Sequence, residues 1–353
     1  MRINSVHFYV TDAINTAHWF INCLGFRVVD RDQDDDTLTI AIVSSSILFV
    51  FSSPINNKGA VADYLAYHAE GIVNVAFCVP SLQPIIDNAR YNNIKILQLI
   101  QQLNNIKYAC FAGWNIQHTV IESTNFCPCY LLPNGKLRTV SNNVAQSAFN
   151  FSAIDHIVLN VASGELAQAV HYYQSLFNFK IQQTFQINTE RSGLYSQALI
   201  DSKGAVQFNI NEPTTANSQI QQFIDLNGGA GIQHLAIKST NLIQDVAQMR
   251  RGQVPFLLIP FAYYSQLKQR LKQDLIQFSA TELQSIIQQS ILLDWHQNRS
   301  NSLLMQIFTQ PILEKPTFFL EFIERRNRAI GFGEGNFNAL FAAVEQEQIS
   351  KFI

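Results

Sequence analysis

Residues 154–159 read IDHIVL, residues 231–237 read GIQHLAI and residues 318–323 read FFLEFI. Each run is short, apolar and rich in β-branched or aromatic residues, which is typical of a strand with a buried face. Side chains two positions apart leave a strand on the same side, so one polar residue in each run can point into a curved sheet. The three runs therefore predict three strands that meet around a shared interior.

Each of these runs contains one side chain that can bind a metal: His156, His234 and Glu321. A lone histidine on an apolar strand is most often a hydrogen-bonded core residue. A carboxylate among phenylalanines is harder to explain in that way, because a buried ionised carboxylate is costly unless a cation or metal pairs with it. Two imidazoles and one carboxylate are the facial set of non-heme iron(II) oxygenases, which leaves positions open for substrate and O2. We therefore expect redox chemistry at an open metal site formed by these three residues.

Composition excludes several classes of protein. The chain has 353 residues, 47% of them hydrophobic, which is enough for two packed domains. Net charge is −2 with 14% charged residues and no long basic cluster, so we expect neither nucleic acid nor a membrane as a partner. No apolar stretch approaches transmembrane length, and the five cysteines lack zinc-site spacing. We expect an unprocessed, cytoplasmic protein with free thiols.

The chain repeats one pattern. Residues 4–10 (NSVHFYV) recur as residues 154–161 (IDHIVLNV), and residues 71–77 (GIVNVAF) recur as residues 231–237. A strand, a helix and several strands follow one another twice in each half. The pattern predicts an α+β fold of two domains, each an open β-barrel built from paired βαβββ modules.

Turn residues at 132–135 (LPNG) and the polar run to about residue 152 predict the domain boundaries. We expect an N-terminal domain over residues 1–135, a linker over 136–152 and a C-terminal catalytic domain over 153–353. Apolar spacing within 263–301 predicts inserted short helices that could cover one mouth of the second barrel. Glycines at 331, 333 and 335 before an apolar stretch predict a C-terminal lid helix.

The repeat suggests which residues of the first half match the metal ligands. We expect His7, Asn74 and Glu122 at the positions of His156, His234 and Glu321, respectively. Asparagine is a poor iron ligand beside imidazole. The first half is therefore predicted to lack a metal site and to serve structure or the contacts of a homo-oligomer, a dimer or a tetramer.

Further motifs of the second half point to a known family. They are Asp155 with His156, INEP (210–213), SQIQ (218–221), GAGIQH (229–234), LMQIFT (304–309), FLE (319–321) and GFGEGNF (331–337), with a weaker match at GWNIQHT (113–119). The chain resembles the 4-hydroxyphenylpyruvate dioxygenase family of the vicinal-oxygen-chelate superfamily, which has a glyoxalase-like fold. The resemblance implies iron(II) on the three ligands and conversion of 4-hydroxyphenylpyruvate and O2 to homogentisate and CO2. Such a reaction serves tyrosine catabolism or the supply of quinone and tocopherol precursors.

The resemblance also implies a substrate pocket. Phe308 and Phe337 offer flat surfaces for an aromatic ring, whereas Ser196, Asn211 and Gln219 offer neutral hydrogen-bonding groups for a phenol. Further residues implied for the pocket are Phe341 in substrate binding and Gln233, Gln306 and Asn336 in catalysis.

One position departs from the family pattern, and several alternatives stay open. The family usually has proline two residues before the asparagine of INEP, whereas this chain has Asn209. A 4-hydroxymandelate synthase would have the same metal site and substrate but would hydroxylate the benzylic carbon. A ring-cleaving extradiol dioxygenase usually needs a histidine or tyrosine acid-base partner that the sequence does not place. A non-catalytic binding protein of the same fold is the alternative from another class.

Overall fold

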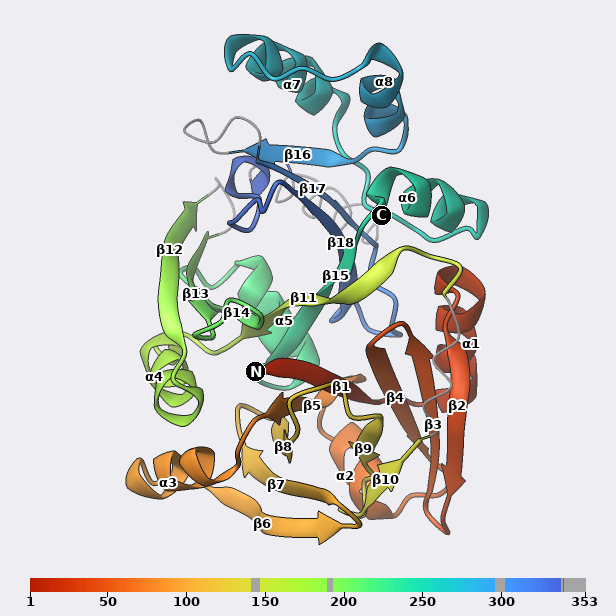
Figure 1. Cartoon of the computed structure of the whole chain (residues 1–353), viewed down its shortest axis with the longest axis vertical. Coiled ribbons are helices and arrows are strands. Elements are labelled where there is room, and N and C mark those ends of the chain that lie inside the picture. The colour runs from red at the N-terminus through yellow and green to blue at the C-terminus, as the bar shows by residue number, and fades with distance from the viewer. Residues whose placement is uncertain (141–146, 189–192, 296–301, 338, 340–353) are drawn as a thin grey trace.

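The computed structural model describes residues 1–140, 147–188, 193–295, 302–337 and 339. Within these ranges each half of the chain forms one eight-stranded sheet, and a two-stranded hairpin accompanies the first (Figure 1). The first sheet lies in the lower part of the view and the second in the upper part. The α+β fold with two related halves is therefore confirmed.

The first half begins with one βαβββ module and continues with a second. Its strands are β1 (Arg2–Tyr9), β2 (Arg27–Gln33), β3 (Thr37–Ser44), β4 (Ile47–Pro54), β5 (Gly71–Val79), β6 (Ile96–Leu103), β7 (Ile106–Ala112) and β8 (Gln117–Glu122). Its helices are α1 (Ala13–Leu24), α2 (Gly59–Leu65) and α3 (Gln83–Tyr91), and the hairpin contains β9 (Cys129–Leu131) and β10 (Leu137–Thr139).

The second half repeats this order. Its strands are β11 (Phe151–Asn160), β12 (Lys180–Asn188), β13 (Gly193–Ile200), β14 (Gln207–Pro213), β15 (Gly231–Ser239), β16 (Leu292–Trp295), β17 (Leu303–Phe308) and β18 (Phe319–Arg326). Its helices are α4 (Leu166–Phe177), α5 (Gln219–Asn227), α6 (Leu242–Arg251), α7 (Phe261–Gln273), α8 (Ala280–Gln288) and the short 3-10 helix η2 (Glu334–Asn336).

Both sheets have the same strand order. It is β2-β3-β4-β1-β5-β8-β7-β6 in the first half and β12-β13-β14-β11-β15-β18-β17-β16 in the second. The two central strands of each sheet are the first strands of its two modules, so residues from both modules meet at the centre. Helices α7 and α8 are inserted before β16 and lie beyond it in Figure 1. Their role as a cover, the domain boundaries and the linker stay predictions, and the lid helix after residue 339 lies outside the described residues.

Strand register corrects the first expected match between the halves. Ser5 pairs with Ala76 across β1 and β5, and His156 pairs with Ala236 across β11 and β15. Ser5, and not His7, is therefore the counterpart of His156. The sequence match was misleading because side chains of a strand repeat every two residues, so His7 shares the face of Ser5 but lies one step further along.

The expected match of Asn74 with His234 is confirmed. Asn74 faces His7 across β5 and β1, and His234 faces Val158 across β15 and β11. His7 is therefore the counterpart of Val158.

The expected match of Glu122 with Glu321 is wrong. The counterpart of Glu321 is Thr119, because both face the matched alanines of β5 and β15. Glu122 matches Glu324 instead. Glu122 accepts a hydrogen bond from the backbone N–H of Leu82 at 3.0 Å, and Glu324 accepts one from Leu242 at 2.7 Å. Each carboxylate thus accepts a hydrogen bond from a backbone N–H at the N-terminus of a helix, α3 in the first half and α6 in the second.

Aromatic side chains join the two halves. His118 of β8 is fully buried, and its Nε2 lies 3.0 Å from the hydroxyl of Tyr173 on α4. Phe8 of β1 meets Phe318 edge to face with 5.2 Å between ring centroids. Within the described residues no helix has both the length and the apolar character needed to span a membrane.

Burial of His118 should make stability depend on pH. Burial lowers the pKa of His118 from 6.5 to about 4. Between these values the unfolded chain binds more protons than the folded one, so stability is lost as pH falls below 6.5. One such group contributes up to about 1.4 kcal/mol per pH unit. Urea unfolding of iron-free protein measures the free energy of unfolding at pH 7.5 and at pH 5.5. The decrease in this free energy between the two pH values should be about 1 kcal/mol smaller in His118→Gln than in the unchanged protein. An equal loss in both proteins would contradict this assignment.

Candidate metal centre

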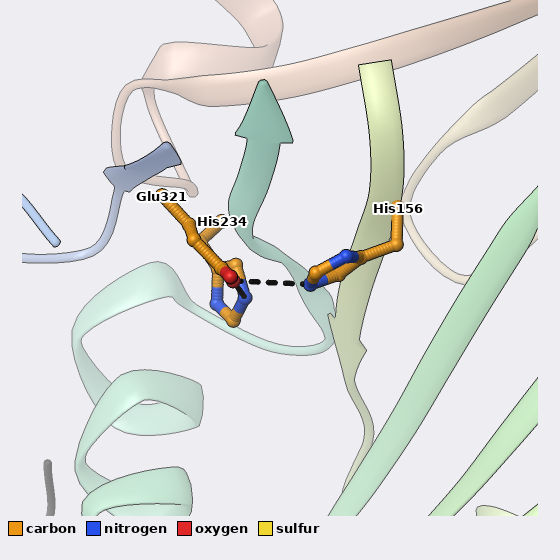
Figure 2. Close-up of side chains that lie close together, drawn as sticks. All are labelled: His156, His234 and Glu321. Carbon is orange, nitrogen blue, oxygen red and sulfur yellow. Dashed lines mark ion pairs between the residues drawn. The ribbon is translucent and has the colours of Figure 1, made fainter. Parts of the chain in front are cut away.

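Three neighbouring strands bring His156, His234 and Glu321 together. His156 lies on β11, His234 on β15 and Glu321 on β18, and the three side chains point toward one another (Figure 2). Oε2 of Glu321 lies 3.1 Å from Nε2 of His156 and 3.6 Å from Nε2 of His234. All three ligand atoms lie within 4.8 Å of one another.

This spacing fits a single metal ion. Bonds of about 2.1 Å at right angles place neighbouring donor atoms about 3 Å apart. Glu321 is 2% exposed, and its second oxygen, Oε1, is buried without a hydrogen-bond partner in the described part of the chain. An ionised carboxylate in such surroundings needs a cation. The donor set of two nitrogens and one oxygen therefore fits a metal of the kind that imidazole and carboxylate bind.

The charges of the three ligands support one another. Burial alone would lower the pKa of His156, but Glu321 and Asp155 raise it to about 9. Burial opposes ionisation of Glu321, yet the two histidines hold its pKa below the usual range. Burial lowers the pKa of His234 and keeps this imidazole neutral, as a metal ligand must be.

A carboxylate and an arginine behind the ligands orient His156. Nδ1 of His156 lies 3.0 Å from Oδ1 of Asp155, so the ring donates there and leaves Nε2 for a metal. Arg325 binds both oxygens of Asp155, at 2.7 and 2.9 Å, and also donates to the carbonyl of Gly331 at 2.8 Å. Burial alone would raise the pKa of Asp155, but Arg325 lowers it well below the usual range. Sequence reasoning missed Arg325, because nothing in its local sequence distinguishes it from Arg326.

A cavity adjoins the three ligands. Of the residues expected in the substrate pocket, six line this cavity together with the ligands: Ser196, Asn211, Gln219, Gln233, Phe308 and Phe337. Its volume is about 100 Å³.

Two described residues expected in the pocket, Gln306 and Asn336, do not line this cavity. Both side-chain nitrogen and oxygen of Gln306 are buried without a partner in the described chain, and a Cβ at Gly333 would collide with this amide. Gly333 also has a φ of +78°, so a side chain there would strain the backbone as well as meet the Gln306 amide. Oδ1 of Asn336 accepts a hydrogen bond from Tyr263 at 2.8 Å, while its Nδ2 has no described partner. Phe341 lies outside the described residues.

Sequence reasoning also missed aromatic residues around the ligands. Phe319 stacks on His234 with 4.7 Å between ring centroids, and Phe332 meets His156 edge to face at 5.2 Å. Phe185 packs edge to face on Phe337 at 5.5 Å. Phe319 and Phe332 stood in quoted motifs, but only the fold shows which rings they touch. Asn209, the departure from the family pattern, lines the cavity, and its Oδ1 is buried without a described partner.

Comparisons with known proteins agree with this fold. Residues 153–273 match the Glyoxalase/Bleomycin resistance protein/Dioxygenase superfamily. The chain is 35% identical to an uncharacterized protein of Synechocystis sp., over 98% of this chain and 97% of that one. It is 31% identical to the 4-hydroxyphenylpyruvate dioxygenase of Sus scrofa, over 99% of this chain and 91% of that one. A mutant of 4-hydroxymandelate synthase from Streptomyces coelicolor has a TM-score of 0.85 at 23% identity, and 98% of each chain is covered.

Loss of any one ligand should remove the metal. His156→Ala, His234→Ala and Glu321→Ala should each lower bound iron at least tenfold after anaerobic loading and desalting, because two ligands form an incomplete set. Elemental analysis measures the iron. Ser5→Ala is the matched control, since Ser5 holds the position of His156 in the first half, and it should leave iron unchanged. Equal loss in the control would contradict the placement of the site.

The bond from His156 to Asp155 should tune metal affinity. Asp155→Ala should weaken iron binding about 10–100-fold, as other losses of such orienting partners do. Asp245→Asn is the control, because Asp245 is another fully buried carboxylate of the second half and accepts from Ser239 and Asn150. It should lower the melting temperature but leave iron affinity unchanged. If titration with iron gives the same affinity for both variants, Asp155 has no orienting role.

Proposed function

The chain belongs to the 4-hydroxyphenylpyruvate dioxygenase family, and we propose that it converts 4-hydroxyphenylpyruvate and O2 to homogentisate and CO2 with Fe(II) as its metal. The observation that carries the proposal is the convergence of His156, His234 and Glu321 on the wall of a cavity with phenylalanine rings and neutral amides. When bound, iron(II) supplies redox chemistry and open positions at which a 2-oxo acid and O2 can meet.

The cavity walls suit the rest of the substrate. Phe308 and Phe337 place aromatic faces beside the ligands, where a phenyl ring can pack. Ser196 and Asn211 face each other across β13 and β14, and Gln219 begins α5. These neutral groups match a phenol, which is uncharged at pH 7 and needs no ion pair. The substrate's charged end would then face the metal and its neutral end the amides.

The substrate requires more room than the cavity has in this structure. Ligand cavities usually measure roughly 300–1,000 Å³, whereas this one measures about 100 Å³. Phe337 follows η2 and is only half-buried, so its ring can move without opening the main core. We expect Phe337 and its neighbours to shift outward when substrate enters and to shield the reacting atoms from water afterwards.

Asn209 distinguishes this pocket within the family pattern. It is 7% exposed and lies on β14 beside Val158 of β11, two residues from Asn211. Its unpartnered Oδ1 can accept a hydrogen bond from a substrate hydroxyl. We propose that Asn209 helps to hold the phenol end, a task that proline could not perform.

Product analysis tests the proposed reaction. Protein loaded anaerobically with iron(II) is mixed with 4-hydroxyphenylpyruvate and O2, and products are separated by chromatography with mass detection. Homogentisate and CO2 should form in equal amounts, with one O2 consumed for each homogentisate formed. Hydroxymandelate as the main product would contradict the proposed product. Iron-loaded protein that binds substrate without turnover would favour a binding protein.

Phe337 should direct attack to the ring. Its aromatic face limits how far the substrate ring can turn from the metal, and reacting atoms must lie about 3–3.5 Å apart. Phe337→Val and Phe337→Ile should raise the fraction of hydroxymandelate among the products severalfold, while the amount of bound iron stays unchanged. Phe337→Tyr keeps the ring and should keep the product ratio. An unchanged ratio in all three variants would remove Phe337 from product control.

A further inference from the structure

A second and larger cavity lies in the first half of the chain. Its volume is about 570 Å³, compared with about 100 Å³ beside the metal ligands. Its walls come from central strands β1 and β5, from β6, β7 and β8, from α2 and from residues 131–135 of the β9–β10 hairpin. Nothing in the proposed reaction uses this cavity.

This cavity occupies the place that the metal centre has in the second half. Strand register matches five of its lining residues with five that line the cavity of the metal centre. The pairs are His7 with Val158, Val73 with Gln233, Asn74 with His234, Cys110 with Phe308 and Gln117 with Phe319. The two cavities are therefore counterparts, and the first is wider in part because Cys110 and Gln117 replace two phenylalanines.

The metal ligands are replaced by neutral groups in this counterpart. Ser5, Asn74 and Thr119 hold the three ligand positions, and Nδ2 of Asn74 donates to Oγ1 of Thr119 at 2.8 Å. This bond leaves the carbonyl oxygen of Asn74 as an acceptor at the cavity wall. The positions thus retain hydrogen-bonding capacity without the charge that a metal needs.

The lining of this cavity carries no net charge. Among the described residues that line it, none is Lys, Arg, Asp or Glu. His7 is the one titratable base there, and burial lowers its pKa to about 3, so its ring is neutral. Nδ1 of His7 lies 3.1 Å from the carbonyl of Leu131 and Nε2 lies 2.8 Å from the hydroxyl of Ser52. His7 therefore ties the hairpin to the sheet, and an anionic ligand would meet no cation on the walls.

Two tyrosines give the cavity an aromatic wall with free polar ends. Tyr9 and Tyr64 meet edge to face with 5.5 Å between centroids. Neither hydroxyl has a hydrogen-bond partner within the described residues, although both side chains line the cavity. Burial raises the pKa of Tyr64 to about 12, so its hydroxyl stays protonated and can donate. Aromatic rings that end in unpaired hydroxyls are suited to a flat ligand with its own polar groups.

We propose that the first half contains a second, metal-free binding site for an uncharged aromatic molecule that carries a hydroxyl or carbonyl group. Its ring packs against Tyr9 and Tyr64, and its polar group reaches the amides of Asn74 and Gln117. The site takes a ligand chemically distinct from a 2-oxo acid, because the walls supply neither a metal nor a cation. This site does not depend on the proposed reaction.

Crystal soaks and calorimetry of the full-length, iron-loaded protein test the site with 4-methylphenol as the probe. We expect ring density against Tyr9 and Tyr64. Cys110→Phe inserts the ring that the second half carries at this position, so it should weaken binding at least tenfold while iron content stays unchanged. The charged analogue 4-hydroxybenzoate should bind at least tenfold more weakly than 4-methylphenol.

A second variant tests the site independently, in case Cys110→Phe does not fold. Tyr64→Leu changes a partly exposed residue of α2, removes one ring and one hydroxyl, and should weaken binding about fivefold to tenfold without loss of folded protein. The proposal is overturned by density only at the metal centre or nowhere, by equal binding of the charged analogue, or by unchanged affinity in a folded variant.

Discussion

The carboxylate of Glu321, buried among phenylalanines on β18 beside the central strand β15, is the constraint on which the site depends. Left alone, it would destabilise the fold, because an unpaired charge is poorly solvated there. Its pairing with His156 and His234 resolves this cost only in part, since its second oxygen has no described partner. A bound metal ion would complete the set. The chemistry and the stability of this core are therefore coupled through one side chain.

Duplication explains how one fold holds two different cavities. The same register that places His156 opposite Ala236 places Ser5 opposite Ala76, so ligand geometry is available in both halves. Only the second half has ligating side chains there, and an ion pair between Asp155 and a buried arginine orients one of them. In the first half, smaller and neutral side chains leave space. The backbone supplies the position, and a few substitutions decide between a metal and an organic ligand.

Periodicity was enough to predict the two-part α+β fold and the convergence of the three ligands, because strand residues two apart share a face. It was not enough for the first half, where a conspicuous histidine, His7, was matched one step out of register and Glu122 to the wrong face. Long-range partners were also hidden from the sequence. Arg325 reaches Asp155 across 170 residues, and no local pattern signals such a contact. The packing of Gln306 under Gly333 likewise depends on tertiary structure.

Anomalous diffraction at the iron absorption edge, from crystals of protein loaded anaerobically with iron(II), tests the central claim most directly. The account predicts one peak in each chain, bonded to Nε2 of His156, Nε2 of His234 and a carboxylate oxygen of Glu321. It predicts no peak at Asn74 and Thr119 in the first half. A peak at another place, or none beside Glu321 in protein that contains iron, would contradict the account.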